Sequence, residues 1–144
     1  MPRGSRRISK SHGIAAPVRL PPPSIDQRNS AMPALAEKNL RAMMTSHVGV
    51  IRDAEHLAEA VRWFAALERD TGNTALRNMA ITALLVATSA WARRESRGAH
   101  HRSDDPAENP ALAHRTMTTL VAAREIAASL SERASARSPQ PMIA

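Results

Sequence analysis

The residues best equipped for chemistry form one polar run, which reads Arg-Arg-Glu-Ser-Arg-Gly-Ala-His at positions 93–100. More polar and turn-forming residues follow it at once: Arg102, Asp104, Asp105 and Pro106. The run comes directly after the longest apolar-periodic segment of the chain, where a helix is expected to end. A glycine and one basic residue are enough to end a helix. The additional charged groups therefore indicate a partner, a substrate or a fixed turn.

Each catalytic or metal-binding arrangement that these residues could form lacks a necessary part. Glu95 and Asp104 could act as a general acid and base, but the sequence shows no cleft that would shift their pKa values. Ser96 has no neighbouring base where a catalytic triad requires one. His100 and His101 are adjacent, so on a helix or strand they point in different directions and are poorly placed to share a metal. We expect a structural role, with no catalytic or metal-binding residue.

Two amphipathic helices are predicted in the first half of the chain. Ser30 is a candidate N-cap for the first, with Pro33 tolerated in its first turn and a break expected at Gly49. Asp53 is the candidate N-cap of the second. Apolar residues recur at three- and four-residue steps over positions 57–67, which defines one buried face of that helix.

The third helix is the clearest prediction. A turn at positions 71–73 precedes an apolar stripe from Leu76 to Trp91, and Gly98 is expected to be the left-handed C-cap that ends the helix. Short connections between three helices predict an antiparallel three-helix bundle. The predicted fold class is all-α, with an extended basic and proline-rich N-terminal tail and, near the C-terminus, a short extended segment plus a helix.

The last forty residues give mixed signals. Asn109 could cap a helix that begins at Pro110, whereas the threonines within positions 114–119 favour extended chain. We expect an extended stretch there, followed by a short helix over about 121–130. The expected organisation is then a tail or linker over 1–30, a helical bundle domain over 31–134 and a frayed tail over 135–144.

The net charge of +7 is concentrated in the first 30 residues, which hold six basic residues, one acidic residue and five prolines. Such a tail can bind phosphate backbones non-specifically. It contains no aromatic side chain that could stack on bases, so the pattern disfavours a nucleic-acid function. The rival hypothesis of a nucleic-acid binder predicts a steep salt dependence of binding that vanishes when residues 1–30 are removed.

The rest of the composition bounds the environment of the protein. The chain has no cysteine, which excludes disulfides and thiolate metal sites and fits a reducing cytoplasm. The weakly polar run over 79–92 falls short of the roughly 18 apolar residues that a membrane span requires. We expect a cytoplasmic protein without a membrane segment.

A family resemblance becomes clear at the polar run. Its pattern, Arg-x-Glu-Ser-Arg-Gly-Ala-His-x-Arg-x-Asp-x-Pro, resembles the C-terminal helical domain of the succinate dehydrogenase, fumarate reductase and L-aspartate oxidase flavoproteins. Positions 40–53, ending in Val-Gly-Val-Ile-Arg-Asp, look like the first helix and following turn of that domain. Positions 57–67 and 76–91 look like its next two helices. The likeness covers about 35–130 and is closest to the L-aspartate oxidase branch.

The resemblance implies a parent enzyme that oxidises L-aspartate to iminoaspartate with FAD, the first step toward quinolinate and NAD. The flavin and substrate sites of that family lie upstream of the matched part, and this chain contains no Gly-x-Gly-x-x-Gly. We therefore expect an accessory domain that binds no FAD alone and is inactive alone. Its implied partners are the FAD-binding and capping domains, with self-association through exposed apolar faces as a further expectation. A domain of the succinate dehydrogenase or fumarate reductase branch and a free-standing helical interaction module remain alternatives.

The resemblance also suggests a role for the polar run. Its charged groups are expected to form a charge-assisted network that fixes the turn after the third helix and docks it to the other domains. Asp105 and His101 stand where the family commonly has aromatic residues, which predicts a looser loop. The residues of this interdomain or structural motif are Arg94, Glu95, Ser96, Arg97, Gly98, His100, Arg102 and Asp104.

Overall fold

The structure, a computed structural model, describes residues 34–137. The expected tail over 1–30, the Ser30 cap, Pro33 and the end of the chain beyond 137 lie outside the described residues. The elements follow in the order α1 (Ala34–His47), β1 (Ile51–Arg52), α2 (Ala54–Asp70), α3 (Thr74–Ala92), β2 (His101–Arg102), the 3-10 helix η2 (Pro110–Leu112) and α4 (Leu120–Arg137). This helical architecture confirms the all-α fold class.

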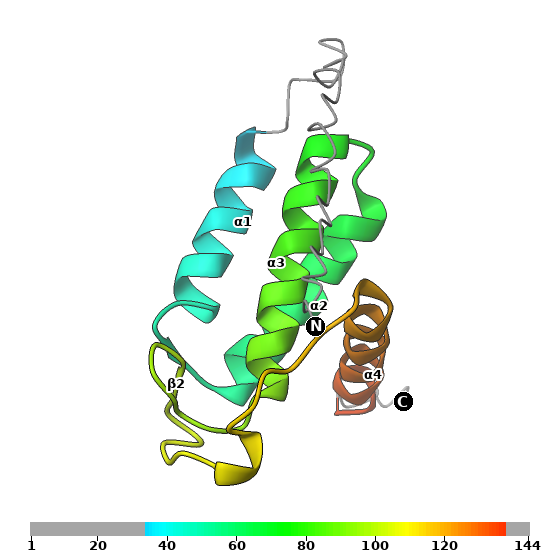
Figure 1. The fold of residues 1–144 in the computed structure, drawn as a ribbon. Helices are drawn as coiled ribbons and strands as arrows, with labels where there is room; N and C mark the ends of the chain where they lie inside the picture. The colour runs from blue at the N-terminus through cyan, green and yellow to red at the C-terminus, as the bar shows by residue number, and fades with distance from the viewer. Residues whose placement is uncertain (1–33, 138–144) are drawn as a thin grey trace, which may run out of the picture.

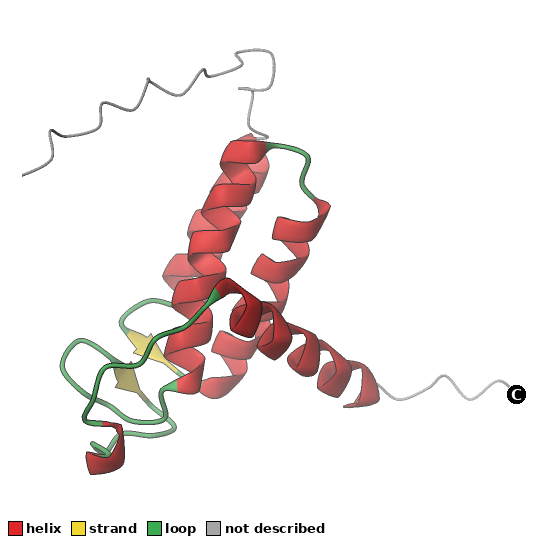
Figure 2. Cartoon of the chain, turned by 45° about the vertical axis from the view of Figure 1, so that its right-hand side comes forward, coloured by secondary structure: helices red, strands yellow, loops and turns green. Residues whose placement is uncertain are grey.

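The first three helices lie side by side (Figure 1), and α4 runs obliquely to them (Figure 2). The two short strands and the loops that carry them gather at one end of the bundle (Figure 2). That end also holds the start of α2 and the end of α3. The long polar turn after α3 is therefore placed beside the termini of two core helices.

The predicted helix boundaries have local physical causes. The Asp53 carboxylate accepts hydrogen bonds from the N–H groups of Glu55 and His56 at 3.0 and 2.9 Å, which caps α2. Asn73 caps α3 in the same way. The chain leaves α1 before Gly49, where a Cβ would lie 2.6 Å from the carbonyl oxygen of Thr45. Only glycine fits that close approach.

The core lies between α2 and α3 and is closed by α1 and α4. Alanine is frequent at the buried positions of α3 and α4, which lets the helices approach closely. Burial of the apolar face predicted for the second and third helices is confirmed. The buried apolar residues on the helices are Leu40, Leu57, Ala58, Ala60, Val61, Phe64, Leu76, Ala80, Ala83, Leu84, Ala87, Ala90, Ala123, Ala127 and Leu130.

Among residues 34–137, α3 alone has the length and mean hydropathy of a membrane-crossing helix. The central helix of a folded domain has the same properties. Leu76, Leu84 and four alanines of α3 are buried among the other helices. These contacts give α3 the role of the core helix of this bundle.

The C-terminal part differs from the expectation in length. α4 runs over Leu120–Arg137, well beyond the short helix expected over 121–130 and into the segment expected to fray. Its buried residues Ala123, Ala127 and Leu130 recur at helical spacing, and the good helix formers after them extend the helix by propensity. The stretch 114–119 forms no strand, and the helix capped by Asn109 is only the three residues of η2.

Candidate functional site

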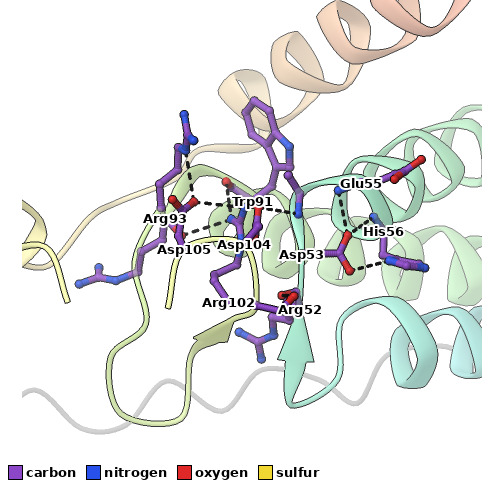
Figure 3. A network of polar contacts seen from close by, with 12 residues as sticks. Arg52, Asp53, Glu55, His56, Trp91, Arg93, Arg102, Asp104 and Asp105 are labelled. Carbon is purple, nitrogen blue, oxygen red and sulfur yellow. Dashed lines mark hydrogen bonds and ion pairs between the residues drawn. The ribbon is translucent and has the colours of Figure 1, made fainter. Parts of the chain in front are cut away.

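The polar run after α3 returns to the bundle through a short parallel pairing of β1 with β2. Ile51 pairs with His101, and Arg52 pairs with Arg102. The amide of Ser103 also donates to the Arg52 carbonyl at 2.8 Å. This register brings the run against the start of α2 and the end of α3, where Figure 3 shows its polar contacts.

Arg102 is the centre of these contacts, and its side chain is only 1% exposed. Its Nη1 lies 3.2–3.4 Å from the carbonyl oxygens of Ala90, Trp91 and Arg93. Its Nε and Nη2 donate to the two carboxylate oxygens of Asp104 at 2.7 and 2.6 Å. The last carbonyls of a helix have no partner within it and carry partial negative charge. The buried guanidinium therefore caps the end of α3.

Asp104 extends this cap to a second helix. Its Oδ2 accepts a hydrogen bond from the Ala54 N–H at 3.0 Å, at the first residue of α2. The hydrogen bonds from Arg102 lower the pKa of Asp104 from 3.8 to about 2, outweighing its partial burial. The pair thus places a cation at the negative end of α3 and an anion at the positive end of α2.

A second cluster surrounds Glu95, whose side chain is fully buried. Its Oε2 accepts from the Arg97 guanidinium at 3.1 Å and from the Asn109 N–H at 2.9 Å. Its Oε1 lies 2.5 Å from Arg93 Nη2. Arg93 also donates to the Leu112 carbonyl at 2.7 Å, so the cluster ties the polar run to η2.

The environment of Glu95 keeps it ionised. Burial alone would raise the pKa of Glu95, because a charged carboxylate is less stable away from water. The hydrogen bonds from Arg97, from the Asn109 N–H and from Arg93 together outweigh burial and lower the pKa from 4.5 to about 2. At neutral pH the cluster is therefore a carboxylate held between two guanidinium groups.

Ser96 and a tight turn complete the path of the run. The Ser96 hydroxyl accepts the Arg102 N–H at 2.8 Å and donates to the Asp105 carbonyl at 2.9 Å. The main chains of Arg97 and His100 exchange two hydrogen bonds, of 2.8 and 3.0 Å. These contacts fix the backbone on both sides of the charged clusters.

Gly98 lies inside that turn with a φ of +58°. The prediction of a left-handed glycine is correct, but the prediction that it caps α3 is wrong. Arg93 occupies the C-cap position of α3. The carbonyls of α3 are satisfied by Arg102, so the helix needs no glycine cap there.

Substituting alanine for Gly98 should lower the free energy of unfolding by about 1–2 kcal/mol, because a side chain disfavours the left-handed conformation. Chemical denaturation followed by circular dichroism measures the change. Gly72→Ala is the matched control, since Gly72 has a negative φ and open space where a Cβ would lie. Equal stability of the two variants would contradict the strained geometry assigned to Gly98.

His100 links the run to β1. Its Nε2 lies 3.0 Å from the Arg93 carbonyl oxygen, and its Nδ1 lies 2.7 Å from Arg52 Nη1. A carbonyl only accepts and a guanidinium only donates, so the ring carries its proton on Nε2 and is neutral. Burial lowers the pKa of His100, and the nearby arginines lower it further.

Comparisons of the sequence with known proteins identify the family. The family model described as "Fumarate reductase flavoprotein C-term" matches residues 71–133, which include α3, the polar run and most of α4. An L-aspartate oxidase of Rhodospirillum rubrum is 42% identical over 107 residues. The chain belongs to the L-aspartate oxidase and fumarate reductase flavoprotein family.

The match covers 70% of this chain and 39% of the Rhodospirillum relative. An L-aspartate oxidase of Caulobacter vibrioides is 39% identical over 89 residues, which are 62% of this chain and 17% of that relative. One of Bacillus subtilis is 35% identical over 83 residues, covering 52% and 16%. The chain thus corresponds to a minor part of these flavoproteins. No solved structure matches it significantly.

In this flavoprotein C-terminal domain, most residues singled out from the sequence meet in the two clusters. Glu95, Ser96, His100 and Arg102 have partners within the run or in β1 and α3. Arg94 lies at the edge, because its side chain is 75% exposed and, among residues 34–137, its one ion pair is with Asp105, at 3.3 Å. Of the remaining members, Arg97 forms an ion pair with Glu95 and Asp104 forms one with Arg102. Gly98 lies in the tight turn.

Sequence reasoning missed four participants. Arg93 and Asn109 complete the Glu95 cluster, and Arg52 holds His100. The Val-Gly-x-x-Arg turn of the family resemblance contained the signal for Arg52. Asp105, expected to loosen the loop, accepts hydrogen bonds from Arg94 and, through its carbonyl, from Ser96.

The described residues of this flavoprotein domain do not form a cofactor cradle. FAD binding in a dinucleotide fold needs a glycine-rich turn between a strand and a helix. Within residues 34–137, Gly49, Gly72 and Gly98 stand singly in three separate turns. Nor do these residues include a group of three or more potential metal ligands. A glycine-rich cradle of that kind is therefore absent from residues 34–137, and the contacts that these residues do form fix the path of the polar run.

Proposed function

We propose that the chain is the C-terminal docking domain of an L-aspartate oxidase-like flavoenzyme and takes no catalytic step itself. The parent reaction would oxidise L-aspartate to iminoaspartate while FAD accepts two electrons and a proton, in the biosynthesis of NAD through quinolinate. The proposal rests on the L-aspartate oxidase relatives, each of which extends well beyond the matched part. We place the domain in the cytoplasm, associated with the FAD-binding and capping domains.

The observation that carries the docking role is that the buried Glu95 and the partly buried Asp104 both already have partners. Glu95 is held by two guanidinium groups and an amide, and Asp104 is held by Arg102 and the Ala54 N–H. Both are ionised and paired with arginines, so neither is suited to accept a proton from a substrate. The network supports a role in presenting a rigid surface at one end of the bundle.

A second argument comes from the surface itself. Several large apolar side chains of the described part are exposed, which a domain without its partner would show. They include Leu35 at 70%, Met117 at 87% and Val121 at 63%. We expect the isolated chain to self-associate through them and to become monodisperse when partner domains cover them.

Reconstitution tests this function. The flavin-bearing part of the Caulobacter vibrioides L-aspartate oxidase would be produced without the region that this chain matches, and aspartate-dependent hydrogen peroxide would be measured. We expect little turnover from either piece alone and a rise of at least tenfold on mixing, because docking completes the enzyme. Glu95→Gln in this chain is the comparison variant and should restore less activity.

Two results would overturn the proposal. One is a purified chain that retains flavin absorbance and oxidises aspartate without a partner. The other is a flavin-bearing part whose turnover is the same with and without the chain, which would favour a free-standing interaction module. If mixing raised turnover with succinate and not with aspartate, the chain would belong to the succinate dehydrogenase branch.

A further inference from the structure

Arg52 differs from the arginines of the polar run in having no carboxylate partner. Its Nε donates to the Gly49 carbonyl at 2.6 Å, and its Nη1 donates to His100. No carboxylate oxygen of the described residues forms an ion pair with it, and no dashed line joins it to the carboxylates drawn in Figure 3. The arginines of the polar run all have such partners: Arg93, Arg94, Arg97 and Arg102.

The surroundings of Arg52 fix its position and compensate its charge only in part, through the Val48 and Gly49 carbonyls just past the end of α1. His100 is neutral, so it orients the guanidinium through one hydrogen bond and contributes no negative charge. Arg52 is half-buried, and a partly buried charge without a counter-ion is destabilising. A carboxylate brought from outside the described residues would remove that penalty.

The surface beside Arg52 has room for such a group. A shallow hollow of about 420 Å³ is lined by Arg52, Arg93, His100, Ser89 and Thr116, with Val86 at its apolar side. It therefore combines two cations and two hydroxyls with no carboxylate. Other hollows in the described part differ, because those around Arg62 also include Glu55 or Glu68.

Exposed apolar side chains stand beside Arg52 in the chain and in the lining of the hollow. Val50 and Ile51 directly precede Arg52 and are 76% and 69% exposed, and Val86 is 45% exposed. Apolar side chains around a charged centre are typical of protein docking surfaces, in which a desolvated ion pair is surrounded by contacts that exclude water. A small free anion would leave these side chains in water.

We propose that Arg52 and the hollow beside it receive a carboxylate side chain from the flavin-bearing part of the enzyme, with Val50, Ile51 and Val86 packing around the ion pair. The assignment rests on the proposed docking function and names the surface that performs it. The partner is thus an acidic residue flanked by apolar residues on that part.

Binding measurements on the full chain test the assignment. The probe is the flavin-bearing part of the Caulobacter enzyme described above, titrated by calorimetry. Arg52→Gln should weaken binding at least tenfold, and the wild-type affinity should fall as salt is raised because the ion pair is screened. Arg62→Gln is the matched control, a half-buried arginine on α2 whose loss should change affinity less than twofold.

A second variant guards against misfolding of Arg52→Gln, which circular dichroism would reveal. Val50→Glu changes an exposed residue and places a competing carboxylate beside Arg52, so it should also weaken binding at least tenfold. Unchanged affinity of a folded Arg52→Gln, or of Val50→Glu, would overturn the assignment while leaving the docking function standing. Absence of wild-type binding would instead remove the docking function together with this assignment.

A last measurement, with free succinate, tests whether the hollow is instead a site for a small anion. We expect no Arg52-dependent binding of succinate to the chain at millimolar concentration. Succinate binding that is lost in Arg52→Gln and that displaces the flavin-bearing part would show a small-anion site, and the docking assignment would be wrong.

Discussion

Methionine in place of Arg102 should lower the free energy of unfolding by about 3 kcal/mol, the low end of the range for breaking a buried ion pair, because the Asp104 carboxylate left behind is 34% exposed. The substitution leaves the Asp104 carboxylate without its two strongest hydrogen bonds. It also leaves the carbonyls of Ala90, Trp91 and Arg93 without a donor at the end of α3. Methionine roughly preserves the volume, so the change reports lost hydrogen bonds and charge. Urea denaturation followed by helical circular dichroism measures it.

The control for this change is Arg115→Met, because Arg115 is exposed and its substitution should stay within about 0.5 kcal/mol. Asp104→Asn, made in the wild-type protein and in Arg102→Met, completes a double-mutant cycle. We expect coupling, since Asp104→Asn should cost less once Arg102 is lost: the ion pair is then already broken and only the contact with the Ala54 N–H remains. Additive losses would contradict the assignment of these residues to one cap.

Glu95→Gln should cost about 3 kcal/mol, also as a broken buried ion pair. Glutamine keeps the shape of the side chain but removes the charge between Arg93 and Arg97, which are 22% and 33% exposed. Partial solvation of the two arginines places the expected loss at the low end of the range. Glu125→Gln on the exposed face of α4 is the matched control and should change stability by less than about 0.5 kcal/mol.

The same variant makes a prediction about pH. The pKa of Glu95 is about 2 in the folded protein, against 4.5 ordinarily. As pH falls below about 4.5, the unfolded chain therefore takes up a proton first, and stability decreases until pH reaches about 2. Wild type should lose more stability across this window than Glu95→Gln. Both proteins still lose some stability as pH falls, because the pKa of Asp104 is also lowered in the folded state. Parallel stability curves would contradict the ion-pair assignment.

The features that sequence reasoning recovers are those with local causes. The caps Asp53 and Asn73 and the stripe from Leu76 to Trp91 involve residues a few positions apart, so their types and spacing determine α2 and α3. The length of α4 depends on packing against helices far away in the chain, which no local pattern expresses. Its composition alone suggested a short helix and a frayed end.

The site shows the same division. The polar run and most of its members stand out by composition, yet the sequence does not reveal which arginine is buried. Arg102 is buried because the parallel register of two-residue strands points it at the end of α3, and such a pairing has no sequence signal. The contact of Arg52 with His100 joins residues 48 positions apart and is equally invisible locally.

The bond from Ala54 to Asp104 ties the beginning of one helix to the guanidinium that closes another. Helix ends ordinarily fray one by one, each at little cost to the rest of the fold. Here the start of α2 and the end of α3 are held by the same loop, between Arg93 and Asp105. Fraying of either helix end therefore requires the contacts of Arg102 or Asp104 to break. We therefore expect the two helix ends and the loop between them to open together, so that this end of the bundle keeps one shape as long as these contacts hold.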